Sequence, residues 1–80
     1  MNKVSNNCYT VSKLEDIDYK TLYKTHGIDN DFIIDWSDGT TEHCCFEDNF
    51  TVVGLTIRPD SETEFSVTLN DKQEPICYAS

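Results

Sequence analysis

The sequence has only three glycines, Gly27, Gly39 and Gly54, and no long apolar run. A P-loop or a dinucleotide-binding fingerprint needs several glycines at close spacing, so neither can be written here and no cofactor is expected. The first residues, "MNKVSNNCYTVSK", contain a lysine but no apolar stretch behind it. This pattern predicts neither a secretory signal nor a membrane anchor. We therefore expect a cytoplasmic protein whose cysteines stay reduced.

Basic residues are also scarce, because six Lys and Arg face fifteen Asp and Glu, for a net charge of −9. Residues 1–27 hold four lysines and three carboxylates, a balance of +1. Residues 28–80 hold twelve carboxylates against Arg58 and Lys72, a balance of −10. Such a field repels nucleic acid and anionic lipid and attracts basic protein surfaces. Direct binding to nucleic acid or to a membrane is not expected.

The 80 residues are enough for a single small domain. Ser12 and Glu15 have the spacing of a capping box and Gly27 stands at a C-cap position, which predicts a helix over residues 13–26. A shorter helix capped by Asp18 is an alternative. Within the domain, residues 1–27 are assigned to a lead strand and the helix, and residues 28–80 to a sheet.

Beyond Gly27 the apolar pattern has a period of two. Asp38-Gly39 predicts a two-residue hairpin turn between residues 31–37 and 40–47, with Asp35 opposite Glu42. Further strands are predicted at residues 8–11, 50–58, 63–69 and near the C-terminus. The predicted fold is α+β: one helix packed on a four- to five-stranded antiparallel sheet. In this register the core face of the hairpin would carry Phe32, Ile34, Trp36, His43 and Cys45.

Four residues are candidate zinc ligands: Cys8, His43, Cys45 and Cys77. His43 and Cys45 share a strand face, but no CxxC or HxxxH spacing accompanies them, so the metal site is a secondary hypothesis. A cysteine nucleophile would need a low pKa beside a base, and nothing in the sequence around His26 or His43 supports one. No catalytic residue is therefore predicted, and the protein is not expected to be an enzyme.

The carboxylates are the main functional candidates. Asp35 and Glu42 would face each other, an arrangement that destabilises a sheet, and rows of carboxylates along strands can imitate a phosphate backbone. In size and charge, though in no motif, the chain is of the type of small acidic anti-restriction and anti-CRISPR inhibitors encoded by phages and mobile elements.

The function predicted on this basis is a DNA-mimic-like inhibitor that blocks a basic surface of a nucleic-acid-binding protein. The alternatives are a thiol or zinc site and a non-catalytic accessory subunit, which could form a homodimer. The predicted contact charges are Asp31, Asp35, Glu42, Glu47, Asp48, Glu62 and Glu64, and the predicted aromatic anchors are Tyr19, Tyr23 and Trp36.

Overall fold

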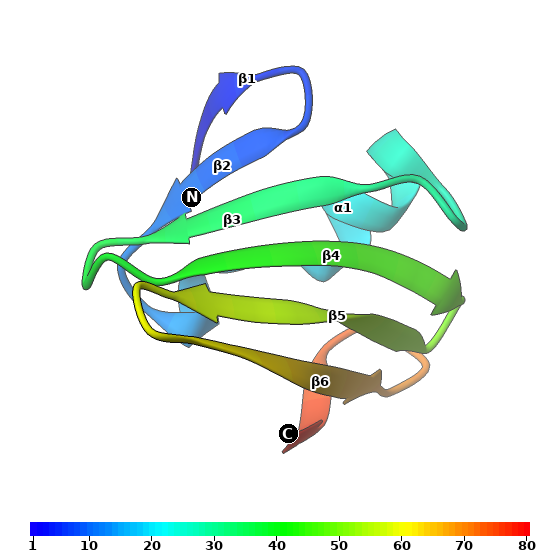
Figure 1. The fold of residues 1–80 in the computed structure, drawn as a ribbon. Helices are drawn as coiled ribbons and strands as arrows, with labels where there is room; N and C mark the ends of the chain where they lie inside the picture. The colour runs from blue at the N-terminus through cyan, green and yellow to red at the C-terminus, as the bar shows by residue number, and fades with distance from the viewer.

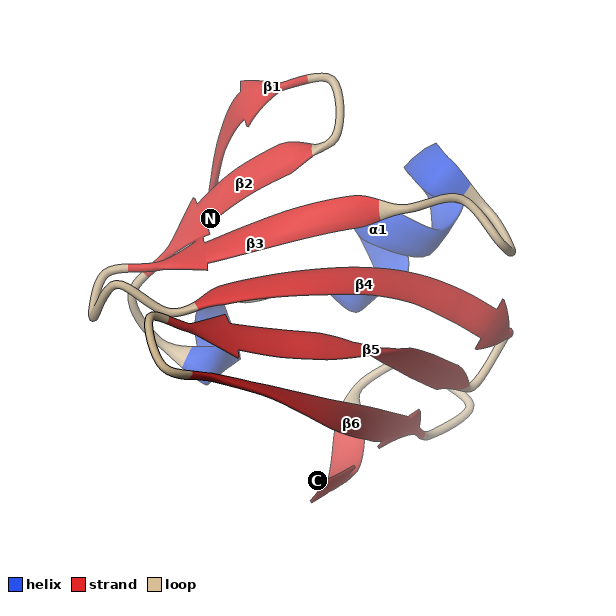
Figure 2. Cartoon of the chain, viewed as in Figure 1, coloured by secondary structure: helices blue, strands red, loops and turns tan.

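The computed structural model describes all residues, 1–80, and consists of one sheet and one helix. The strands lie side by side in chain order (Figure 1). A 3-10 turn, η1 (Leu14–Asp16), and the helix α1 (Tyr19–His26) lie between the second and third strands in the chain. Figure 2 draws both in blue and the strands in red. The seven strands are β1 (Asn2–Ser5), β2 (Cys8–Val11), β3 (Phe32–Trp36), β4 (Thr41–Asp48), β5 (Thr51–Arg58), β6 (Ser61–Leu69) and β7 (Pro75–Ala79).

The sheet is mixed, so the predicted four- to five-stranded antiparallel sheet is wrong in both strand number and strand direction. β2 and β3 run parallel, with Cys8 beside Ile33 and Val11 beside Trp36, and all other neighbouring pairs are antiparallel. The parallel pair arises because the segment containing α1 crosses over between the two strands. β1 was not predicted from the sequence, because all four of its residues are exposed and show no apolar alternation.

The helix begins at Tyr19 and not near residue 13. The Asp18 carboxylate caps it by accepting hydrogen bonds from the Thr21 backbone N–H, at 3.1 Å, and from the Thr21 hydroxyl, at 2.8 Å. These bonds lower the pKa of Asp18, because both favour its charged form. Gly27, with φ of +70°, ends the helix as predicted. The structure thus confirms the shorter of the two helices considered.

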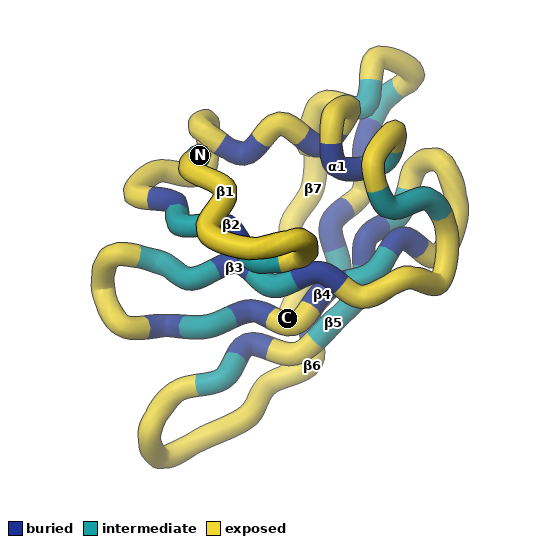
Figure 3. The backbone as a smooth tube through the Cα atoms, turned by 90° about the horizontal axis from the view of Figure 1, so that it is seen from above, coloured by how far each residue is buried: buried dark blue, intermediate teal, exposed yellow.

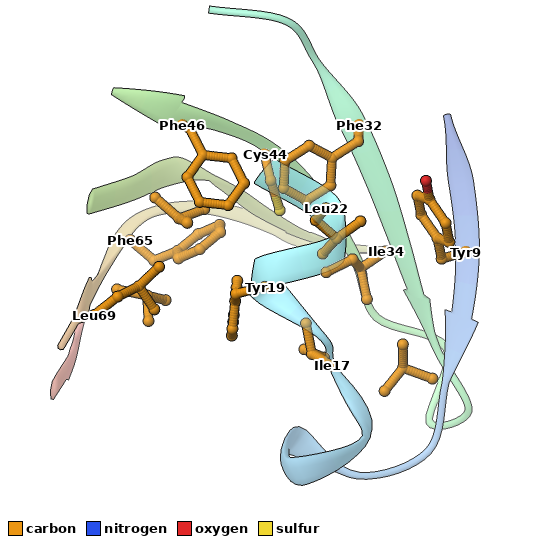
Figure 4. Close-up of a cluster of buried hydrophobic side chains, with 13 residues drawn as sticks. Tyr9, Ile17, Tyr19, Leu22, Phe32, Ile34, Cys44, Phe46, Phe65 and Leu69 are labelled. Atoms are coloured by element: carbon orange, nitrogen blue, oxygen red, sulfur yellow. The ribbon is translucent and has the colours of Figure 1, made fainter. Parts of the chain in front are cut away.

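The late start of the helix also changes which side chains it buries. Tyr19 and Leu22 point into the core, whereas Leu14 lies in η1 and is 41% exposed. Figure 4 shows Tyr19 and Leu22 among the side chains of the sheet. The sequence analysis predicted Tyr19 as an aromatic anchor for a partner, and its burial in the core corrects that prediction.

The core lies between α1 and the inner face of the curled sheet, which we define as the side of the sheet that faces α1. The curl brings β7 and α1 to the same side of the central strands (Figures 1 and 3). No helix is long and apolar enough to cross a membrane. The buried apolar side chains form one cluster: Tyr9, Val11, Ile17, Tyr19, Leu22, Phe32, Ile34, Cys44, Phe46, Val52, Phe65, Val67 and Leu69.

The loop that joins β3 and β4 is one residue longer than predicted. The Trp36 N–H donates to the Thr40 carbonyl at 2.8 Å, and the Gly39 N–H donates to the Trp36 carbonyl at 3.1 Å. Residues 37–39 therefore form the loop, and Gly39 has the positive φ, +93°, that the third position of such a loop favours. Asp35 consequently faces Thr41 and not Glu42.

This one-residue difference exchanges the two faces of β4, because side chains alternate along a strand. Glu42, Cys44 and Phe46 are buried on the inner face, while His43 is exposed and Cys45 half-buried on the other side. The predicted core face containing His43 and Cys45 is therefore wrong. Its β3 members Phe32 and Ile34 are in the core, as expected.

Gly54 is the position in the sheet that tolerates no side chain. A Cβ atom added there would lie 1.9 Å from the His43 carbonyl oxygen and 3.0 Å from a ring carbon of Phe65. The first of these contacts is with backbone, which a side-chain rotation cannot relieve. Close approach of a neighbouring backbone is a recurrent reason for glycine within a strand.

We predict that Gly54→Ala lowers the free energy of unfolding by at least about 2–3 kcal/mol, because the β4–β5 pairing must distort to admit the methyl group. Urea denaturation followed by circular dichroism measures this loss. The control Ser66→Ala, on the neighbouring strand, should stay within about 0.5 kcal/mol of the wild type. Equal stability of the two variants would contradict the close approach.

Candidate functional site

The side of β3–β6 that faces away from α1 has no element covering it, and we call it the outer face. Its apolar side chains lie toward the middle and are half-buried, except for Leu55, which is 36% exposed. Carboxylates lie on both borders: Asp35 on β3, and Glu62 and Glu64 on β6. The outer face comprises Ile33, Asp35, Thr41, His43, Cys45, Val53, Leu55, Ile57, Glu62 and Glu64.

The two borders are connected by one row of paired residues. Asp35 pairs with Thr41, Thr41 with Ile57, and Ile57 with Glu62. Three strand spacings of about 4.8 Å therefore separate the carboxylate-bearing strands, roughly 14 Å along the sheet. No Lys or Arg belongs to this face, since Arg58, the single Lys or Arg of β3–β6, points to the inner face.

Asp35 is held in place by neighbours on the same face. Its Oδ1 accepts a hydrogen bond from the Thr41 hydroxyl at 2.9 Å, and its Oδ2 accepts one from the Cys8 thiol at 3.4 Å. These bonds fix the direction of the carboxylate at the border of the outer face. Glu62 and Glu64 are exposed.

Three further predicted contact charges, Asp31, Glu47 and Asp48, are exposed where β3 begins and β4 ends. Asp31 and Glu47 raise the pKa of the Cys45 thiol, after the larger effect of burial, which shows that their charges act on the outer face at this point. Asp48 instead accepts a hydrogen bond from the Phe50 backbone N–H at 2.8 Å in the turn that follows β4.

The predicted aromatic anchors do not lie on the outer face. Tyr19 is 4% exposed in the core. Tyr23, on the helix, packs edge-to-face against Phe46 and donates a hydrogen bond to Asn49 at 2.5 Å. Trp36 lies half-buried on the inner face. Since all three are on the helix side of the sheet, we assign contact at the outer face to its aliphatic residues.

The candidate zinc ligands do not assemble into a site. Cys8, His43 and Cys45 lie on the side of the sheet away from α1, and Cys77 is on the edge strand β7. No group of three or more His, Cys, Asp or Glu side chains is close enough together to hold a metal ion. Burial raises the pKa of Cys8, Cys44 and Cys45, which keeps these thiols protonated and unlike the low-pKa thiols of nucleophilic sites.

Glu42, predicted as a surface charge, is only 5% exposed and is the most deeply buried carboxylate of the chain. Its Oε1 accepts a hydrogen bond from the Trp36 indole N–H at 2.9 Å. Its Oε2 accepts from the Thr56 hydroxyl at 3.2 Å and from the Tyr78 hydroxyl at 2.5 Å. The carboxylate therefore links β3, β4, β5 and β7 through three uncharged donors.

Sequence reading did not identify Thr56 or Tyr78 as partners of Glu42. Strand alternation could have identified Thr56, because with the correct hairpin register Glu42 and Thr56 are both polar residues at inward-facing positions. Polar groups at such positions require hydrogen-bond partners. Tyr78 could not be placed in this way, because every residue of β7 is exposed.

No protein-family model matches this chain, and neither a curated protein nor a solved structure gives a significant match.

We predict that Glu42→Gln lowers the free energy of unfolding by about 1–3 kcal/mol, because the amide NH₂ faces hydrogen-bond donors and the charge-assisted bonds are lost. The matched control Glu64→Gln makes the same change of charge on the outer face and should shift stability by less than about 0.5 kcal/mol. Chemical denaturation of both variants at neutral pH tests this. Equal losses would contradict a structural role for the Glu42 carboxylate.

A second prediction concerns pH. Partial burial of the ring and then the hydrogen bond to Glu42 raise the pKa of Tyr78 to about 12, from about 10 in an unfolded chain. A raised pKa means that folding favours the neutral phenol, so its contribution is complete below pH 10 and is lost as pH rises toward 12. The unfolding free energy of Tyr78→Phe should therefore fall less than that of the wild type over this range. Parallel curves for the two proteins would contradict the assignment.

Proposed function

We propose that the protein binds a basic surface of a nucleic-acid-handling protein through the outer face and thereby blocks that surface. The observation that carries this proposal is the composition of the face, with carboxylates on both borders, aliphatic side chains between them and no Lys or Arg. An opposite charge on the partner would be attracted over a distance before contact. Because the face repels nucleic acid, a protein is the more suitable partner.

The spacing of the borders supports mimicry of a nucleic acid. The strands bearing Asp35 and Glu62 are roughly 14 Å apart along the sheet, which is comparable to the major-groove width of about 12 Å in DNA. A basic surface shaped to contact two phosphate strands would therefore find carboxylates at a similar separation. Small acidic inhibitors of restriction and CRISPR nucleases have this size and charge, and we propose that the protein acts in the same way.

The aliphatic middle of the face supports a protein partner in particular. Val53, Leu55 and Ile57 follow one another at alternate positions of β5, where Leu55 is exposed and the other two are half-buried. Burial of such a strip in an interface adds non-polar contact to the charge attraction. A phosphate backbone has no counterpart to this strip, so mimicry would be combined with contacts that only a protein makes.

The experiment is inhibition of DNA cleavage by a panel of purified restriction and CRISPR nucleases at several salt concentrations. Glu62→Lys combined with Glu64→Lys should weaken inhibition at least about tenfold, because it reverses the charge of one border. The control is Glu15→Lys with Asp16→Lys, the same change of charge on the exposed η1 turn. It should retain most of the inhibition.

Inhibition of a susceptible nuclease should weaken as salt rises, because screening reduces attraction between exposed charges. Equal inhibition by the two double variants would contradict binding through the outer face. If no nuclease of the panel is inhibited, the proposal fails. A molecular mass that rises with protein concentration and does not respond to salt would then support the alternative, a self-associating accessory subunit.

A further inference from the structure

A pocket of about 360 Å³ opens beside Glu42 on the inner face, opposite to the outer face. Its lining includes the three aromatic and acidic groups of the Glu42 cluster, namely Glu42, Trp36 and Tyr78. Thr63, an exposed residue of β6, lines its mouth together with Asp38 and Arg58. The volume is within the range of small-ligand sites, which are concave and contain a few placed polar groups.

The charge at the floor of this pocket has no cation beside it. All three hydrogen bonds to Glu42 come from uncharged groups. Arg58 acts on Asp38, whose pKa it lowers together with the stronger hydrogen bonds from Thr40, so these two rim charges offset each other. A carboxylate has about four lone-pair sites, and three of those on Glu42 are used. Oε1, which accepts from Trp36 alone, retains one.

From this geometry we infer that the pocket binds an organic cation, an alkylammonium or guanidinium group, which donates a hydrogen bond to Glu42 Oε1 between Trp36 and Tyr78. Burying a carboxylate is costly unless it is paired, and a cationic ligand supplies the pair. Aromatic rings next to the site add attraction for a cation. A divalent metal fits poorly, because no group of three or more His, Cys, Asp or Glu side chains is placed to hold one.

Trp36 is the single tryptophan of the chain, so its indole N–H gives one NMR signal that reports directly on the hydrogen bond to Glu42. We would titrate the whole protein with n-butylammonium and n-butylguanidinium, with neutral n-butanol as the matched control. A saturable shift of the indole signal with either cation, and not with butanol, is the expected result. Saturation by butanol to the same extent, or no saturation at all, would overturn the inference.

Two variants test the residues. Glu42→Gln should weaken cation binding about tenfold or more, because a charge-assisted hydrogen bond is lost. Glu64→Gln, on the outer face, should change it by less than about twofold. If Glu42→Gln does not fold, Thr63→Phe provides the test, since it narrows the pocket mouth from an exposed position and leaves Glu42 in place. Unchanged binding by Thr63→Phe, or by a folded Glu42→Gln, would overturn the inference.

The cation can come from a free amine or from a Lys or Arg side chain. Blocked tripeptides with a central Lys or Arg distinguish the two sources. Peptides that bind as tightly as the butyl cations assign the pocket to a protein side chain, and peptides that fail to bind assign it to a small amine. The test is separate from that of the outer face, because it uses no nuclease and no outer-face charge except the control.

Discussion

The Glu42 carboxylate is the interaction on which the inner side of this sheet depends. A buried carboxylate must be solvated by the protein, and here Trp36, Thr56 and Tyr78 provide that solvation from three different strands. The edge strand β7 has no buried residue, and besides its pairing with β6 it is held by the Tyr78–Glu42 bond and by the stacking of Tyr78 against Phe65, whose ring centroids are 5.5 Å apart. In this small domain a cluster of buried hydrogen bonds thus connects strands that a larger protein would hold together with more buried apolar side chains.

The hairpin loop is what puts Glu42 in this position. With residues 37–39 as the loop, the inner face of β4 carries Glu42, Cys44 and Phe46. With a two-residue loop the same strand would turn His43 and Cys45 inward, and the buried cluster would have no acceptor. A single residue of loop length therefore decides both the polar interior and the composition of the outer face.

The two proposed sites follow from the division of the sheet into faces. The outer face has carboxylates at its borders and no Lys or Arg, and it suits a broad, basic protein surface. The pocket on the inner face contains one buried carboxylate between aromatic rings and suits a single small cation. The four thiols do not converge, burial raises the pKa of Cys8, Cys44 and Cys45 and so keeps them protonated, and Cys44 packs in the core.

The sequence by itself determined the elements that rest on local chemistry: the helix end at Gly27, the Asp18 cap that was one of two alternatives, the main strands from their period of two, and the acidic character of residues 28–80. The tertiary structure alone decided the parallel pairing of β2 with β3 and the presence of β1, whose four exposed side chains give no periodic signal. It also decided that Glu42 is buried while Glu62 and Glu64 are not. Alternation predicts which residues share a face, but only the register and packing of the whole sheet decide which face meets the core.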